Sequence, residues 1–198
     1  ANAAVDIEYK YPFGFKELEG IHSRTNFDLS QHEEFSGKKL QYFDNELEES
    51  YVPFVVETSI GLDRMFLSIL SHAFTEEKLE DGSERTVLKI PAALAPYKVA
   101  ILPLVKKDGM DEKAIEIYNE LKFHFNCQYD EKDSIGKRYR RQDAIGTPYA
   151  ITVDGQSLED NTVTVRYRDT MEQKRVSVDE LLVEISKEVA IENVLKAL

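Results

Sequence analysis

The second half of the chain alternates apolar segments with amphipathic ones, and this order limits the possible folds more than any other feature. "KVAILPLV" (98–105) indicates a buried strand, and 110–125 is an amphipathic helix whose apolar face carries Ala114, Ile117, Tyr118 and Leu121. Further strands are expected at 127–131, 148–154, 161–169 and 172–178, and further helices at 134–146 and 178–189. Strands separated by helices predict an α/β fold, in which a mixed sheet carries packed helices.

The first half shows short strand candidates around one helix. "FKELEGI" (15–21) alternates as a strand does, 26–37 is typical of a short helix, and "LQYFD" (40–44) is a second strand candidate. "VPFVVETS" (52–59) is a nearly continuous apolar run, which predicts a strand buried on both faces.

A second amphipathic helix follows Gly61. Its apolar residues stand at i, i+3, i+4, i+7, i+8 and i+11, which is the spacing of one helix face: Leu62, Met65, Phe66, Ile69, Leu70 and Ala73. The next segment is polar, has a turn signal at Asp81-Gly82, and ends in two prolines. We therefore expect two domains, 1–92 and 93–198.

The charge of the chain is negative but unevenly distributed. The net charge of −12 argues against a nucleic-acid partner. Residues 137–175, however, hold 8 basic and 6 acidic side chains, so a mildly basic strip interrupts the acidic surface. No apolar run approaches the ~20 residues that span a bilayer, which predicts no membrane partner. The single cysteine, Cys127, allows no internal disulfide and fits a reducing cytoplasm.

Residue types that carry chemistry are few. The four histidines do not cluster with other metal ligands, Cys127 is expected to fill core space, and no glycine-rich phosphate loop is present. Glu57 draws attention because a carboxylate at the end of a buried strand needs a cationic partner. That partner could be internal, Arg24 or Arg64, or it could be the ammonium group of a ligand; the residues alone slightly favour the internal pair.

Longer motifs resemble one enzyme family. "VVETSIGLDRMFLSIL" (55–70) resembles motif 3 of the class II aminoacyl-tRNA synthetases. "FGFKELEGIHSRTNFDLSQH" (13–32) resembles glycyl-tRNA synthetases of the dimeric α2 type. The segments 94–122 and 137–155 resemble the anticodon-binding domain that the glycyl, histidyl, threonyl and prolyl enzymes share.

This resemblance implies a fold and a reaction. Residues 1–92 would be the last part of a class II catalytic domain, with an antiparallel sheet, and 93–198 an anticodon-binding domain with a mixed five-stranded sheet. The reaction would be the ATP-dependent ligation of glycine to its tRNA through glycyl-adenylate, by a cytoplasmic homodimer that uses ATP and Mg²⁺. Motifs 1 and 2 of the family have no counterpart in 1–16, so this chain is expected to be a C-terminal fragment that is inactive alone. The alternative is a synthetase-like accessory protein that binds nucleic acid without catalysis.

The same resemblance assigns roles to single residues. ATP would contact Glu17 and Leu18, and again Gly61, Leu62, Asp63 and Arg64, with Arg64 as the catalytic residue. Glycine would contact Glu57, Thr58, Ser59, Ile60 and Gly61, although many relatives have proline where Thr58 stands. No metal ligands are expected from protein side chains alone, and Mg²⁺ would arrive with ATP, near Glu17 or Glu19.

The basic strip gains a use in this family. Its cations would follow the backbone of glycine tRNA near the anticodon: Lys137, Arg138, Arg140, Arg141, Arg166 and Arg168, with Lys174 and Arg175 beside them. Tyr139, Tyr149 and Tyr167 are aromatic candidates for base stacking. For the cations, the alternative of a solvated charged face has about equal weight, because acidic residues interleave with the basic ones. For each of the three tyrosines, a position in the core is favoured.

Overall fold

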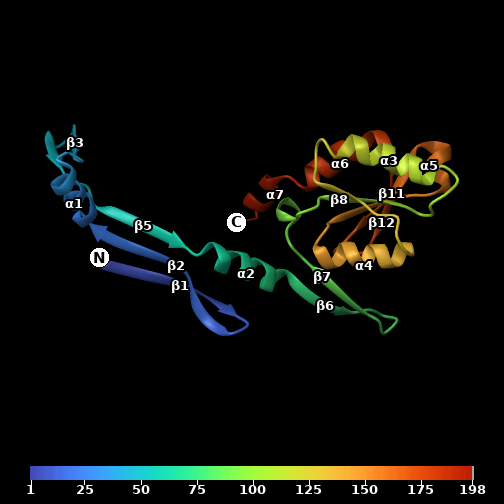
Figure 1. The fold of residues 1–198 in the computed structure, drawn as a ribbon, viewed down its shortest axis with the longest axis horizontal. Helices are drawn as coiled ribbons and strands as arrows, with labels where there is room; N and C mark the ends of the chain where they lie inside the picture. Colours follow the sequence, from blue (N-terminus) through green and yellow to red (C-terminus); the bar gives the residue numbers. More distant parts are fainter. Residues whose placement is uncertain (198) are drawn as a thin grey trace. The chain divides into compact units, whose positions relative to one another are not determined.

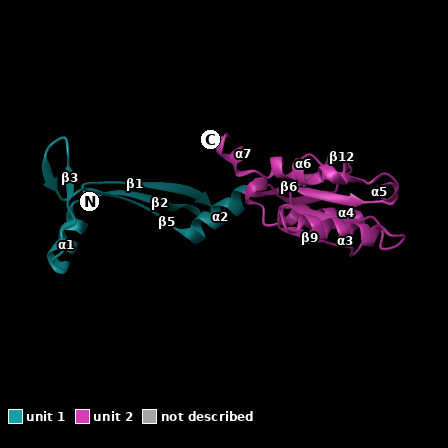
Figure 2. Ribbon diagram, turned by 90° about the horizontal axis from the view of Figure 1, so that it is seen from above, with its two compact units in different colours: residues 1–72 teal, residues 73–198 magenta. Residues whose placement is uncertain are grey.

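The computed structural model describes residues 1–197 and divides into two compact units, Ala1–His72 and Ala73–Leu198 (Figure 2). The division falls at the end of helix α2 (Leu62–Ala73). The predicted domain boundary at residues 92 and 93 lies further along the chain and stays a prediction. None of the helices in residues 1–197 is long and apolar enough to cross a membrane.

The first unit is built on a three-stranded antiparallel sheet in the order β1-β2-β5 (Figure 1). The strands are β1 (Ala3–Tyr11), β2 (Gly14–Thr25) and β5 (Val55–Ile60). Helix α1 (Phe27–Ser36) follows β2 and ends at Gly37, whose φ of 67° is the left-handed conformation that favours glycine. A small hairpin of β3 (Tyr42–Asp44) and β4 (Glu49–Tyr51) precedes β5. The predicted helix after Gly61 is confirmed as α2.

Strand β5 is not buried on both faces, so that prediction is wrong. Val56 is 70% exposed and Ile60 is 45% exposed. Within the residues that the structure describes, β5 hydrogen-bonds to β2 alone and is the edge of the sheet. The apolar run that indicated a central strand is therefore an exposed apolar surface of this unit.

The second unit contains a five-stranded mixed sheet in the order β12-β11-β10-β8-β9. Strands β10 (Tyr149–Val153), β8 (Val99–Pro103) and β9 (Cys127–Tyr129) are parallel, and β9 is the edge strand. Strands β11 (Thr162–Tyr167) and β12 (Gln173–Ser177) add an antiparallel hairpin to β10. The mixed sheet predicted from the order of strands and helices is confirmed.

Helices cover both faces of this sheet (Figure 1). Helices α3 (Met110–Leu121) and α6 (Leu181–Glu188) bury apolar side chains in one core with β8, β10 and β11. Helix α4 (Ile135–Ile145) packs Ile135 and Tyr139 against Ala100, Leu102 and Ala150 on the other face. The shorter helices are η1 (Ala92–Leu94), α5 (Gly155–Asp160), η2 (Val178–Glu180) and α7 (Ile191–Leu195). On β9, Cys127 is half-buried beside the first core, and burial raises the pKa of its thiol to about 11.

A hairpin that the sequence did not predict precedes this sheet. Strands β6 (Phe74–Lys78) and β7 (Glu84–Leu88) pair around the expected turn at Asp81-Gly82, and β7 packs against α4. The hairpin is acidic and has no continuous apolar run, but it buries Arg85 and Val87 almost completely. Its position places Arg85 next to the polar side of α4.

Candidate functional site

The residues predicted to bind glycine lie on two faces of the first sheet. Because β5 pairs with β2 in regular register, His22 stands opposite Glu57 and Gly20 opposite Ser59. Side chains alternate between the faces of a strand, so Glu57 and Ser59 share one face while Thr58 and Ile60 point to the other. The structure therefore brings Glu57 and Ser59 together and separates them from Thr58 and Ile60, while the fifth predicted residue, Gly61, follows the end of β5.

Glu57 has an internal cationic partner. Its Oε2 lies 3.3 Å from Nη1 of Arg24, and its side chain is 41% exposed. Arg24 also donates two hydrogen bonds to Asp28, of 2.9 and 3.0 Å, and these bonds lower the pKa of the Asp28 carboxyl. Of the two readings of Glu57, the structure shows the ion pair, with an exposed carboxylate still open to a ligand.

The residues predicted to contact ATP do come together. The Gly61 N–H donates to the carbonyl of Leu18 at 3.3 Å, and Nη1 of Arg64 donates to the carbonyl of Glu17. The Tyr11 hydroxyl donates to the carbonyl of Arg64 at 3.2 Å, so the first turn of α2 is tied to both β1 and β2. Leu62, Asp63 and Arg64 are all exposed. These roles stay predictions, but the backbone contacts explain how residues 17–18 and 61–64 share one corner.

Metal ligands are sparse in this corner. Among residues 1–197, no group of three or more His, Cys, Asp or Glu side chains lies close enough to hold a metal ion. Glu17 and Glu19 by themselves supply too few oxygens for Mg²⁺, which takes near-octahedral coordination.

In the second unit, two of the predicted tRNA contacts are occupied within the protein. Arg138 on α4 is 2% exposed and donates to the carbonyls of Pro103, Leu104 and Asp130, so it joins α4 to the end of β8. Burial lowers the pKa of its guanidinium. Arg141 is bound by two aspartates, at 2.7 Å to Asp130 and 2.9 Å to Asp133, and these hydrogen bonds raise its pKa.

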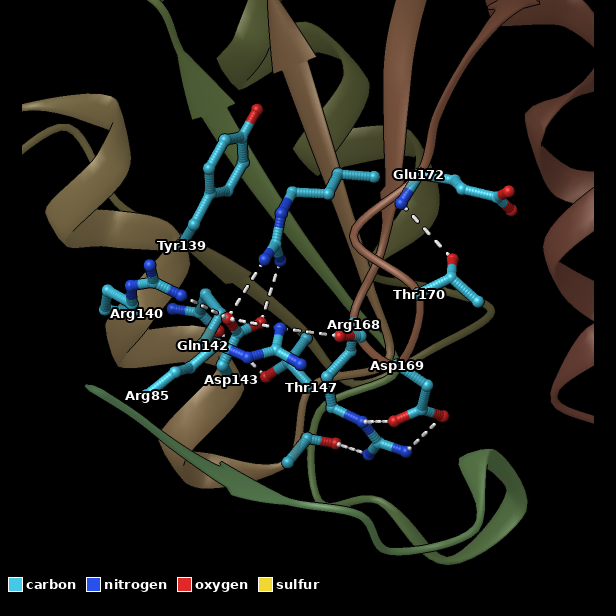
Figure 3. Close-up of polar contacts among 12 residues, drawn as sticks. Arg85, Tyr139, Arg140, Gln142, Asp143, Thr147, Arg168, Asp169, Thr170 and Glu172 are labelled. Carbon is cyan, nitrogen blue, oxygen red and sulfur yellow. Dashed lines mark hydrogen bonds and ion pairs between the residues drawn. The ribbon is translucent and has the colours of Figure 1, made fainter. Parts of the chain in front are cut away.

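Two arginines of β11 and the following turn are also paired, but with different neighbours. Arg166 donates to both oxygens of Asp143, at 2.8 and 3.0 Å. Arg168 donates to Asp169 at 2.7 and 2.9 Å and to the carbonyl of Gly146 at 2.8 Å (Figure 3). Both arginine side chains are buried.

An open cleft collects the remaining cations between α4 and β11. The α4–β11 cleft has a volume of about 400 Å³ and is lined by Gly136, Lys137, Tyr139, Arg140, Arg166, Met171 and Gln173. The guanidinium carbon of Arg166 lies 4.7 Å from the centre of the Tyr139 ring, and we call these two lining side chains the floor of the cleft. The Tyr139 hydroxyl is held by the Thr152 hydroxyl at 2.6 Å. The α4–β11 cleft therefore brings the cations Lys137 and Arg140 together with the aromatic ring of Tyr139.

The other predicted positions lie outside this cleft. Tyr149 and Tyr167 form an edge-to-face pair at 5.5 Å, and Tyr149 belongs to the apolar core. On β12, Arg175 is bound to Asp154 at 2.7 Å, whereas Lys174 extends toward solvent.

Sequence reasoning missed the buried acid and the arginine that organise the cleft. Asp143 is fully buried, and Arg85 from β7 donates to it at 3.2 Å (Figure 3). A signal was available, because Asp143 is the one acidic residue in the predicted helix 134–146, among four basic residues. Arg85 carried no such signal, since its strand was not predicted.

Comparison with known proteins identifies the second unit first. Residues 98–188 match the family model described as an anticodon binding domain. The solved RNA-binding domain of threonyl-tRNA synthetase from Cryptosporidium parvum superposes with a TM-score of 0.68, over 93% of this chain and 42% of that one. At 22% identity this likeness shows a shared fold. Residues 98–188 are therefore similar to an anticodon-binding domain, and the chain shares the fold of a synthetase RNA-binding domain.

Proteins that are similar in sequence indicate a more specific class of enzyme. The chain is 53% identical over 189 residues to the glycine–tRNA ligase of Clostridium tetani, which covers 96% of this chain and 40% of that protein. It is 54% identical over 183 residues to the glycine–tRNA ligase of Borrelia hermsii, covering 91% of this chain and 41% of that protein. Almost the whole length of the chain is therefore similar in sequence to part of the glycine–tRNA ligases. The chain spans about two fifths of their length.

Proposed function

We propose that this chain is part of an enzyme that ligates glycine to tRNA, and that its second unit binds the anticodon region of glycine tRNA. The α4–β11 cleft carries this proposal. It presents Lys137 and Arg140 around the Tyr139 ring and the Arg166 plane, inside a segment that matches an anticodon-binding domain. The relatives named above supply the reaction class.

The chemistry of the cleft suits an unpaired stretch of RNA. Lys137 and Arg140 stand at the opening and would neutralise backbone phosphates, while the aromatic and guanidinium planes would accept a splayed base. Arg138, Arg141 and Arg168 are bound by carbonyls and carboxylates of the protein, so we assign them to the scaffold of the domain.

Binding to RNA through this cleft should depend on salt and on two side chains. Replacing Lys137 and Arg140 together by glutamine should weaken binding of an RNA hairpin with a glycine anticodon by roughly tenfold at low salt. Each lost phosphate contact should also reduce the slope of log affinity against log salt by about 0.7. Fluorescence anisotropy at several salt concentrations measures both quantities.

A matched pair of substitutions controls for net charge. Lys174→Gln with Lys187→Gln removes the same charge from side chains that are 61% and 68% exposed and lie outside the cleft. An equal loss of affinity in the two pairs would overturn the assignment of the cleft.

For the first unit, we propose that Arg64 offsets phosphate charge on ATP and that Glu57 attracts the glycine ammonium group. Their contacts to β2 and to Arg24 support this assignment, since both charged groups are held in place and remain exposed. The glycine carboxylate would attack the α-phosphorus of ATP, take up the adenylyl group and release pyrophosphate, and Mg²⁺ would arrive with the phosphate oxygens of ATP. Catalysis would rest on electrostatic stabilisation, without a covalent nucleophile.

This corner alone should not make glycyl-adenylate. Glu57 and Ile60 are partly open to water, whereas selection of glycine needs a closed, tightly filled wall. We therefore expect no ATP–pyrophosphate exchange above background with the 198-residue chain, glycine, ATP and Mg²⁺. Glycine-dependent exchange by the purified chain would refute this expectation.

A further inference from the structure

The floor of the α4–β11 cleft is held by a carboxylate that no solvent reaches. Asp143 is 0% exposed, and its two oxygens accept hydrogen bonds from Arg166 at 2.8 and 3.0 Å and from Arg85 at 3.2 Å. Arg140 approaches the same carboxylate at 4.0 Å from the rim of the cleft. One negative charge therefore orients three arginines, two of which line the cleft.

Arg85 reaches this carboxylate from outside the central sheet. It is 1% exposed, and β7 carries it against α4. The rest of its guanidinium donates to Glu77 at 2.9 and 2.5 Å and to the carbonyl of Arg168 at 2.9 Å. The β6–β7 hairpin, α4 and the turn after β11 thus meet at a single side chain.

The geometry makes the position of Arg166 depend on this pair. A guanidinium that binds both oxygens of a carboxylate has a defined plane, and here that plane lies over Tyr139. Without the hydrogen bond from Arg85, the Asp143 carboxylate would be free to rotate. The guanidinium plane of Arg166, which binds both oxygens of that carboxylate, would rotate with it. Lysine in place of Arg85 keeps the charge but cannot bridge Glu77, Asp143 and the Arg168 carbonyl at once.

We propose that Arg85 and Asp143 are positioning residues for RNA selection, through which the β6–β7 hairpin sets the floor of the α4–β11 cleft. The inference rests on the proposed function of that cleft and goes beyond it. It assigns a part in recognition to a hairpin that is itself acidic.

The test compares two RNA hairpins bound by the whole chain. One carries a glycine anticodon, and the other has the same stem with the three anticodon nucleotides replaced. Arg85→Lys and Asp143→Asn should each lower the preference for the first hairpin by about tenfold, the contribution of one well-placed arginine contact. In Arg85→Lys, affinity for the second hairpin and the salt slope should stay unchanged, because this variant keeps the net charge and leaves Asp143, Lys137 and Arg140 intact.

A half-buried ion pair whose two residues do not line the cleft separates a positioning role from general damage to the fold. Arg175 and Asp154 form a similar forked pair, at 2.7 and 3.0 Å, between β12 and the start of α5. Arg175→Lys and Asp154→Asn should leave the preference between the hairpins unchanged. All measurements are normalised to the folded fraction, and if Asp143→Asn does not fold, Arg85→Lys carries the comparison.

A double-mutant cycle makes the outcome decisive. If Arg85 acts through Arg166, then Arg85→Lys with Arg166→Lys should lose no more preference than Arg166→Lys alone. Additive losses, an unchanged preference in folded Arg85→Lys, or an equal loss in the Arg175 variant would each overturn the inference. Wild-type protein that binds both hairpins equally would instead overturn the proposed function of the cleft.

Discussion

At the scale of single residues, the backbone and the neighbours of Gly146 restrict which side chain this position can carry. Gly146 ends α4 with a φ of +84°, and a Cβ there would lie 2.8 Å from Cγ2 of Ile90 and 3.1 Å from the carbonyl of Leu88. Gly146→Ala should therefore lower the free energy of unfolding of the second unit by about 2 kcal/mol or more. Urea unfolding followed by circular dichroism measures this loss.

Gly136 provides the comparison within the same helix. Its Cβ would meet no atom within 4 Å, and its φ lies outside the left-handed range. Gly136→Ala should leave stability unchanged or raise it by roughly 0.5–1 kcal/mol, since alanine favours helix. If both substitutions had the same effect, steric crowding at Gly146 would be the wrong explanation.

The residue scale also shows what the sequence could and could not predict. The apolar faces of α3 and α6 followed from spacing, because apolar side chains are informative when they recur. On α4 the buried side chains are Arg138, Gln142 and Asp143, which have the composition of a solvated face. Their burial depends on partners from β7, β8 and β11, and no local pattern carries that information.

At the scale of elements, the β6–β7 hairpin depends on ionised groups for its attachment. Glu77 accepts from Lys89 at 2.6 Å and from the buried Arg85 at 2.5 Å. Hydrogen bonds from Lys89, and then from Arg85, hold the pKa of Glu77 below its ordinary value of 4.5, although burial opposes the shift. Glu77 therefore attaches β6 to β7 and to Lys89 through a carboxylate that must stay deprotonated.

This attachment predicts a dependence of stability on pH. A carboxyl group whose pKa is lower in the folded state stabilises the fold above its unfolded-state pKa. That contribution is lost as the pH falls through the folded value. Between about pH 6 and pH 3 the unfolding free energy should fall less steeply in Glu77→Gln than in the wild type. Urea unfolding at several pH values measures the slopes.

The neighbouring Glu76 is exposed on the same strand and serves as the control. Glu76→Gln should keep the wild-type pH slope, and equal slopes in all three proteins would show that Glu77 does not attach the hairpin by its charge.

Whole elements, like single residues, could be predicted where apolar side chains recur and could not be predicted where buried polar side chains depend on distant partners. Strands with apolar runs, such as β8 and β10, were recognisable because both of their faces are buried. Strands β6 and β7 were not, since their buried positions include an arginine whose partners lie far away in the sequence. The sheet register that puts His22 opposite Glu57 also required the partner strand to be known.

At the scale of the whole molecule, apolar side chains remain uncovered on the first unit. Val56 and Ile60 project from one face of the edge strand β5, and Leu62 at the start of α2 is 81% exposed. Apolar surface of this kind favours association at about 25 cal/mol per Å² removed from water, and an unpaired strand edge adds backbone donors and acceptors. The chain should therefore self-associate at micromolar concentrations.

Two substitutions test which surface is responsible. Val56→Thr with Ile60→Thr keeps the preference for strand and should lower the weight-average mass in light scattering after size-exclusion chromatography. Ile191→Thr changes a side chain that is 48% exposed on the second unit and should leave the mass as it is. If the mass is equally high in all three proteins, association does not proceed through β5.

The half-buried thiol on β9 has a consequence for how motion in this protein can be observed. β9 is an edge strand that pairs with β8 alone in the described sheet. With a pKa of about 11, Cys127 is almost wholly protonated at neutral pH, and only the thiolate reacts with alkylating reagents. Exposure to water would return the pKa toward 9.0 and raise the thiolate fraction by about two orders of magnitude. Cys127 is thus a built-in chemical reporter. Its alkylation rate measures how often β9 detaches from the edge of the sheet and exposes the thiol.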